Sequence, residues 1–94
     1  MMHSYKLYSS LPELTTHKIW AEIDLDALRG NYRALCQEIR RTTPDCRMMC
    51  VVKADAYGHG IDACVDALLG EGCDFFAVSS SEEAIAVRQV CRSV

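Results

Sequence analysis

The sequence predicts an α/β protein in which a parallel sheet is covered by helices. First, strand-like and helix-like segments alternate in the order β, α, β, α, β, α with short connections, which is typical of parallel sheets. Second, residues 47–53 and 74–78 are apolar runs of the length expected for strands buried on both faces. A chain of 94 residues holds one small domain or a piece of a larger one.

The N-terminal region divides into a polar leader and a first strand. Residues 1–17 show no sustained periodicity and contain several Ser and Thr residues and a proline, so we expect an irregular leader. Residues 18–25 alternate between polar and apolar side chains, with Ile19, Ala21 and Ile23 on one side, as in a half-buried strand. Because strands inside a parallel sheet are usually apolar on both faces, we expect an edge strand or an antiparallel partner here.

Three helices are predicted from their apolar stripes and end signals. Asp26 can cap a helix that runs to about residue 41, where arginines suit the C-terminal dipole and Pro44 stops the helix. Residues 61–69 return to helical spacing, and glycines follow them. Ser80 opens the last helix, because a glutamate three residues later completes a capping box.

The composition excludes several classes of binding partner and indicates a cellular compartment. The net charge of -3 and the pI near 5.5 argue against nucleic acid or an anionic membrane surface as the main partner. The longest apolar run, residues 48–52, is far shorter than the roughly 20 residues that span a membrane. The six cysteines include no C-x-x-C pair, so we expect no zinc site. A disulfide scaffold would need a secreted chain poor in aliphatic residues, and this sequence has neither property. Free, mostly buried cysteines are typical of the cytoplasm.

Lys53 is the main candidate for chemistry. It ends an apolar strand, and the carboxyl ends of strands are where α/β proteins bind ligands. A period of two puts Met49, Val51 and Lys53 on one face of that strand. If this face lines a closed sheet, the lysine is partly desolvated, which favours the neutral amine that Schiff-base chemistry requires. The alternative is a solvated lysine at the end of a strand.

The residues that follow this lysine form a candidate anion-binding turn. Gly58 and Gly60 flank His59 just before a helix, where backbone N–H groups favour an anion such as phosphate. The alternative is that the two glycines make a turn and bind nothing. Tyr57 either donates its hydroxyl to a phosphate or packs as a loop aromatic. The sequence favours a loop-ordering role for His59 over that of a base. We expect Asp55 to make a local turn or cap hydrogen bond, because a free carboxylate would keep the lysine charged.

Residues 51–60, VVKADAYGHG, closely resemble the pyridoxal-phosphate attachment segment of alanine racemases. Residues 21–28 (AEIDLDAL) with 31–33 (NYR) resemble the opening of that family, and residues 76–78 (FAV) with 82–84 (EEA) resemble its next unit. The resemblance implies the N-terminal β/α units of a (β/α)8 TIM-like barrel, with a separate β-rich C-terminal domain outside this chain. A complete barrel takes about 250 residues, so the barrel is incomplete here.

By this resemblance the chain divides into the leader, residues 1–17, and an N-terminal part of the cofactor-binding barrel, residues 18–94. Lys53 is then the catalytic residue and binds pyridoxal 5'-phosphate covalently, while Tyr57 contacts the phosphate of the cofactor. The implied activity is the interconversion of L-alanine and D-alanine, which supplies D-alanine for the cell wall. The implied protein is a cytoplasmic homodimer that acts on a small-molecule amino acid. Its second acid/base is a tyrosine in the C-terminal domain of the partner subunit.

Three interpretations stay open at this point. The chain is the N-terminal portion of such a racemase, truncated and inactive alone, or it is a cofactor-binding module without turnover. A third interpretation is a non-enzymatic remnant that does not fold stably, with residues 48–52 as an exposed, aggregation-prone strand. The substrate is also open, because serine and broader racemases share the lysine segment.

Overall fold

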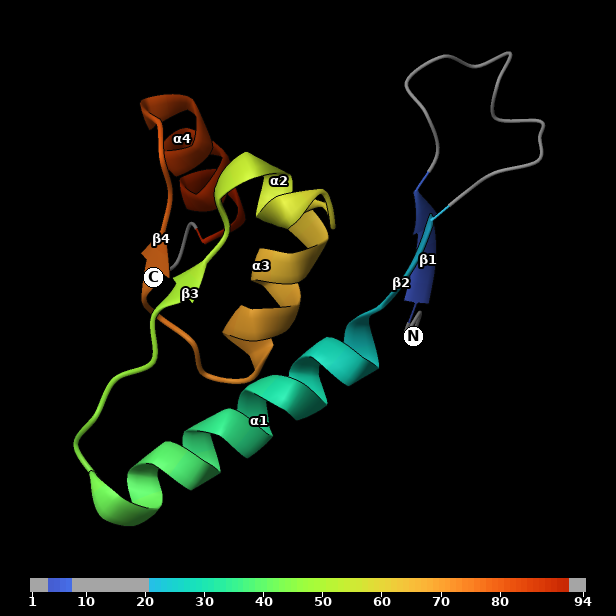
Figure 1. Cartoon of the computed structure of the whole chain (residues 1–94). Coiled ribbons are helices and arrows are strands. Elements are labelled where there is room, and N and C mark those ends of the chain that lie inside the picture. The colour runs from blue at the N-terminus through green and yellow to red at the C-terminus, as the bar shows by residue number, and fades with distance from the viewer. Residues whose placement is uncertain (1–3, 8–20, 92–94) are drawn as a thin grey trace, which may run out of the picture.

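Two separate two-stranded sheets and four helices make up the described part of the chain, which is residues 4–7 and 21–91 of this computed structural model. Helix α1 is the longest element, and helices α3 and α4 lie beside the second sheet (Figure 1). The expected order β, α, β, α, β, α is present from β2 onward, with strand β1 and the short helix α2 in addition, so the mixed α/β class is confirmed. The elements in chain order are β1 (Ser4–Leu7), β2 (Ala21–Asp24), α1 (Leu25–Thr42), β3 (Cys50–Val51), α2 (Lys53–Tyr57), α3 (Ile61–Gly70), β4 (Phe76–Ala77) and α4 (Ser81–Val90).

Strands β1 and β2 form an antiparallel pair that lies apart from the other sheet (Figure 1). In their register Ser4 is opposite Asp24. The antiparallel partner expected at residues 18–25 is therefore confirmed for the part that the structure describes. The irregular leader is wrong at Ser4–Leu7, because this short strand is defined by its pairing with β2 and not by a periodicity of its own. The rest of the leader lies outside the described residues, and its boundary stays a prediction.

Helix α1 begins directly after β2, and Asp24 is its N-cap. The Asp24 carboxylate accepts a hydrogen bond from the Ala27 backbone N–H at 3.0 Å. Strand β2 ends at this residue in an extended conformation, which is the backbone geometry that an N-cap requires. The cap predicted at Asp26 is wrong, because Asp26 lies inside the first turn and pairs with Arg29 at 3.1 Å. The helix ends at Thr42, close to the predicted end.

Strands β3 and β4 are neighbouring parallel strands, as the order of elements predicts. Cys50 lies opposite Phe76, and Val51 lies opposite Ala77. Each strand is two residues long, shorter than the apolar runs that predict them. Burial on both faces is wrong for β3, since Val51 is 44% exposed and Val52, which follows it, is 3% exposed. Within the described residues, one face of β3 is covered and the other is exposed, whereas both residues of β4 are partly buried.

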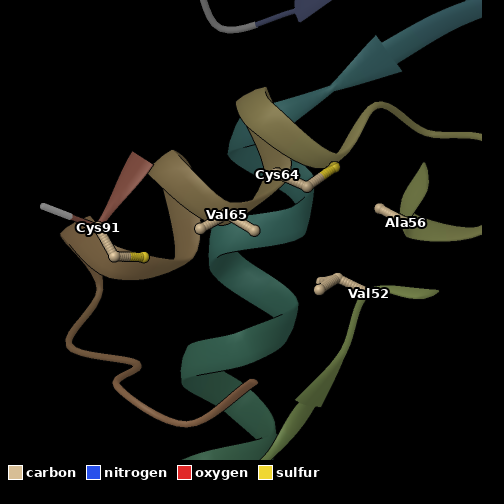
Figure 2. Packing of buried hydrophobic residues seen from close by; sticks show 5 residues of the cluster. All are labelled: Val52, Ala56, Cys64, Val65 and Cys91. Carbon is tan, nitrogen blue, oxygen red and sulfur yellow. The ribbon is translucent and has the colours of Figure 1, made fainter. Parts of the chain in front are cut away.

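Helix α3 supplies the centre of the main core. Val65 has no exposed surface and packs in one cluster with Val52, Ala56, Cys64 and Cys91 (Figure 2). In Figure 2 the side chains of Val52 and Ala56 lie toward the helix that carries Val65. Removing such side chains from water is the main favourable contribution to folding. Other elements complete the cluster with partly buried apolar side chains, namely Leu28, Ile61, Leu69, Phe76, Val78, Val87 and Val90.

A second cluster combines a phenol with several thiols. Tyr32, Cys36, Leu68 and Cys73 are buried together, and the Cys73 Sγ lies 3.5 Å from the Cys50 Sγ. Burial raises the pKa of the Tyr32 phenol, and it raises the pKa of the Cys50 thiol to about 12, so both groups stay protonated at neutral pH. All six cysteines are free and four are buried, which confirms that they act mainly as small apolar residues.

The described helices and side-chain clusters also bear on membrane and metal binding. No helix formed by residues 4–7 and 21–91 is both long enough and apolar enough to cross a membrane. Over the same residues, no group of three or more His, Cys, Asp or Glu side chains is arranged so that it could hold a metal ion.

Candidate cofactor site

Lys53 follows the carboxyl end of β3, and its side chain is exposed. Met49 and Val51 are 46% and 44% exposed, whereas Val52 on the opposite face is buried. The predicted position of Lys53, at the strand end and on the face of Met49 and Val51, is therefore confirmed, and its role stays a prediction. The desolvation expected inside a closed sheet is not present, because the described residues cover only the other face of β3.

Residues 54–57 form a left-handed helical turn directly after Lys53, with φ between 53° and 58° at all four positions. None of them is glycine, and this conformation costs roughly 1–2 kcal/mol per residue with a Cβ. Backbone hydrogen bonds of 2.9 Å hold the turn, because the N–H of Ala56 donates to Val52 and the N–H of Gly58 donates to Ala54. Strain of this kind persists only where the surrounding structure fixes it, and it concentrates at functional sites.

Buried and exposed side chains recur at intervals of four residues along this turn. Val52 and Ala56 are 3% and 8% exposed and belong to the main core (Figure 2). Lys53 and Tyr57, each one residue further along the chain, are exposed, Tyr57 by 58%. The structure therefore leaves Lys53 and Tyr57 exposed at the two ends of the turn and anchors the turn by burying Val52 and Ala56.

These two side chains fit a cofactor that carries an aldehyde and a phosphate. A primary amine can bond an aldehyde carbon covalently, and a phenol hydroxyl can donate a hydrogen bond to a phosphate oxygen. Both residues are exposed on a turn that the core holds in place. The chemistry of these two residues is thus compatible with pyridoxal 5'-phosphate, and the roles predicted for Lys53 and Tyr57 stay a prediction.

Asp55 and His59 order the loop that leads to α3. The Asp55 Oδ1 accepts a hydrogen bond from the Ile61 backbone N–H at 2.8 Å, which confirms the predicted cap role. The His59 Nδ1 lies 3.0 Å from the Ala56 carbonyl oxygen, as expected for a residue that orders the loop. The candidate anion site at the start of α3 cannot use the Ile61 N–H, because this N–H already donates to the Asp55 carboxylate. That part of the prediction is wrong. The two glycines of the loop, with φ of 84° and 92°, make the turn.

Glu83 joins the turn to the end of β4, a contact that the sequence did not predict. Its Oε2 accepts from the Ala54 N–H at 2.7 Å, and its Oε1 accepts from the Ser79 N–H at 2.7 Å and the Ser79 hydroxyl at 2.9 Å. The hydrogen bonds from Ser79, and then the bond from Ala54, lower the pKa of the Glu83 carboxyl. Ser80 caps α4 by accepting from the Glu83 N–H at 3.1 Å, so the serine half of the predicted capping box is confirmed. The glutamate half is present only as a minor contact, because the Glu83 carboxylate bonds mainly Ser79 and Ala54 and the Ser80 backbone N–H contributes least to its lowered pKa.

A groove of about 740 Å³ runs beside the turn. Residues of β2 and α1 line one side of it, and β3, the turn and α3 line the other. Tyr57 and His59 belong to this lining, together with the exposed apolar side chains of Met49 and Val51. Lys53 is not among the lining residues. A ligand that contacts both Lys53 and Tyr57 therefore lies at the border of the groove.

Parallel strands with connecting helices define an α/β protein. The exposed lysine on a strained turn at the carboxyl end of a strand marks a candidate ligand site at the usual edge of the sheet. The chain belongs to the alanine racemase family, because the family model "Alanine racemase, N-terminal domain" matches residues 23–92. The resemblance to that family is thereby confirmed, and the mixed α/β fold with parallel strands agrees with the N-terminal part of the family's barrel domain.

Proteins from several microorganisms show the same relationship. Alanine racemase of Methanococcus maripaludis is 46% identical over 76 residues, which are 80% of this chain and 19% of the relative. Alanine racemase of Chromohalobacter salexigens is 52% identical over 69 residues, which are 73% of this chain and 18% of the relative. The catabolic alanine racemase of Pseudomonas aeruginosa is 46% identical over 69 residues, with the same two shares. No solved structure matches the chain. The chain thus spans less than a fifth of the length of these relatives.

Proposed function

We propose that this chain is the N-terminal portion of a pyridoxal-phosphate-dependent alanine racemase and that Lys53 is its cofactor lysine. The observation that carries the proposal is the exposed Lys53 at the end of β3, at the start of a strained turn that ends with the exposed Tyr57. Membership of the alanine racemase family supports the choice of cofactor. The proposed reaction interconverts L-alanine and D-alanine and supplies D-alanine for the cell wall.

Each exposed residue of the turn has a proposed task. The Lys53 Nζ binds the aldehyde carbon of the cofactor, and the Tyr57 hydroxyl donates a hydrogen bond to the cofactor phosphate. Pyridoxal 5'-phosphate, when bound, delocalises the electron pair that remains when a substrate Cα loses its proton. When the substrate amine takes the place of Lys53 on the cofactor, the Lys53 Nζ would be released as a free neutral amine that removes or returns that proton on one face of Cα.

Racemisation also needs an acid/base on the opposite face of Cα. In our proposal the complete protein is a cytoplasmic homodimer, and a tyrosine from the C-terminal domain of the partner subunit supplies this group. The chain covers 19% of the Methanococcus relative and 16% of the Streptomyces coelicolor relative. For this chain alone we therefore propose binding of the cofactor without turnover. Serine or another amino acid stays an alternative substrate for the complete protein.

The test uses the three lysines of the chain, Lys6, Lys18 and Lys53. The purified chain is mixed with pyridoxal 5'-phosphate, reduced with borohydride and digested, and mass spectrometry measures the label on each lysine. We expect Lys53 to carry the most label. We also expect the visible absorbance change on adding the cofactor to be lost in Lys53→Ala and kept in the control Lys18→Ala. Equal labelling of the three lysines, or equal spectra for wild type and Lys53→Ala, would contradict the proposal.

A further inference from the structure

The Glu83 carboxylate takes the place of a strand carbonyl at the point where the β3–β4 ladder ends. Along that ladder the Cys50 N–H donates to the carbonyl of Phe75, and the Val52 N–H donates to the carbonyl of Ala77, both at 2.9 Å. Two residues further on, the Ala54 N–H donates to the Glu83 Oε2 at 2.7 Å. The ladder is therefore continued for one more bond by a side chain from α4 and not by the backbone of β4.

The other carboxylate oxygen is held by Ser79, in the segment between β4 and α4. The Glu83 Oε1 accepts from the Ser79 N–H at 2.7 Å and from the Ser79 hydroxyl at 2.9 Å. One carboxylate thus joins the first residue after Lys53 to the first turn of α4, across 29 positions of sequence. These three bonds use both oxygens of an ionised carboxyl group, and hydrogen bonds to charged groups are the stronger kind.

The Glu83 carboxylate binds the residue at which the backbone becomes left-handed. Ala54 is the first left-handed residue, with φ of 53° and ψ of 49°, and it is adjacent to Lys53. This conformation is unfavourable for alanine, so a contact that holds the Ala54 N–H favours the turn over an extended continuation of β3. The orientation of the Lys53 backbone depends on the same peptide unit, since its carbonyl and the Ala54 N–H belong to one planar group.

We propose that Glu83 is a positioning residue for Lys53: its carboxylate ends the parallel ladder, fixes the left-handed turn at Ala54 and so holds the lysine amine toward the cofactor. The part of this proposal that concerns the cofactor rests on the proposed function. The part that concerns the turn stands on the geometry of the described residues alone. Glu83 itself touches neither substrate nor cofactor in this scheme.

The test compares three variants of the whole chain. In Glu83→Gln the side chain keeps its size but has one acceptor oxygen, so an NH₂ group opposes either the Ala54 or the Ser79 N–H. Glu82→Gln removes the same charge from the neighbouring, exposed residue of the same helical turn. Ser80→Ala removes the N-cap bond from the Glu83 N–H, so it weakens α4 without removing the carboxylate.

Two readouts follow the two parts of the proposal. Amide hydrogen exchange by NMR reports the Ala54 N–H directly, and borohydride trapping with pyridoxal 5'-phosphate reports the label on Lys53 relative to Lys18. We expect Glu83→Gln to speed exchange at Ala54 by about tenfold, the factor for one lost hydrogen bond to a charged group, and to lower the Lys53 to Lys18 ratio severalfold. We expect Glu82→Gln and Ser80→Ala to leave both quantities near their wild-type values.

The outcomes separate this proposal from the proposed function. Unchanged exchange at Ala54 in Glu83→Gln overturns the link, whatever the labelling shows. Faster exchange with an unchanged labelling ratio, or an equal fall of the ratio in Ser80→Ala, overturns the positioning role, because the effect is then one of general stability. If the wild-type chain labels Lys53 no more than Lys6 and Lys18, the proposed function fails, while exchange at Ala54 still decides whether Glu83 holds the turn.

Discussion

The Asp55 carboxylate accepts a hydrogen bond from the backbone N–H of Ile61 at 2.8 Å, so a residue of the left-handed turn caps helix α3. Asp55 thereby serves two structures at once. It satisfies a donor at the start of α3 that has no partner within the helix, and it tolerates a φ of 58° better than most residues because Asp and Asn stabilise this conformation locally.

Asp55→Ala is expected to lower the free energy of unfolding by about 1–2 kcal/mol, because it removes the cap and puts alanine at a positive φ. Asp55→Asn keeps an acceptor oxygen and the local preference, so it should remain within about 0.5 kcal/mol of wild type. Urea unfolding followed by circular dichroism measures both variants. The control is Asp66→Ala on the exposed face of α3, the helix that Asp55 caps. A loss in Asp66→Ala equal to that in Asp55→Ala would show that the cap contributes nothing specific.

Tyr57→Phe is expected to weaken binding of pyridoxal 5'-phosphate and to leave binding of pyridoxal, which has no phosphate, unchanged. The ring of Tyr57 is 58% exposed, so removing its hydroxyl disturbs little packing. A hydrogen bond to a charged group contributes about 1.5 kcal/mol or more, which is roughly a tenfold change in affinity. Absorbance titration of both compounds measures the difference. Equal weakening of the two would assign Tyr57 a role other than phosphate contact.

The position of Lys53 could be predicted from the sequence, whereas the shape of its turn could not. The strand end and the face of Lys53 follow from a period of two in the residues just before it. The left-handed turn has no local signal, because Ala54 and Ala56 have no preference for positive φ. It is fixed by burial of Val52 and Ala56 against α3 and by the Glu83 carboxylate, both of which come from distant parts of the chain.

The fold divides in the same way between local and non-local information. Helix α3 ends one residue beyond the predicted 61–69, because its apolar stripe and its flanking glycines are local signals. Strand β1 was missed because four residues have no legible period until their partner β2 is known. The sequence predicts the cap of α1 at Asp26, whereas the structure has it at Asp24. Both aspartates suit an N-cap, and only the end of β2 distinguishes them.

The free energy of unfolding is expected to decrease on acidification, because Glu83 becomes protonated. The carboxyl pKa is lowered from its ordinary value of 4.5 in the folded state, mainly by the hydrogen bonds from Ser79. The unfolded chain therefore binds the proton first, so the contribution of Glu83 is complete above about pH 5 and is lost as the pH falls through the lowered folded pKa. Urea unfolding of wild type and Glu83→Gln from pH 7 to pH 3 measures it. The difference between the two should shrink on acidification, and a constant difference would contradict the titration.

Val65→Ala is expected to lower the free energy of unfolding by about 2 kcal/mol, because the side chain has no exposed surface and its loss leaves a cavity beside Cys64 and Cys91. The matched control is Ile85→Ala on α4, where a 59% exposed side chain contributes little and the change should stay within about 0.5 kcal/mol. Urea unfolding followed by circular dichroism measures both. This comparison also addresses the possibility of an unstable remnant: a chain without a packed core gives no cooperative transition and makes the two substitutions indistinguishable.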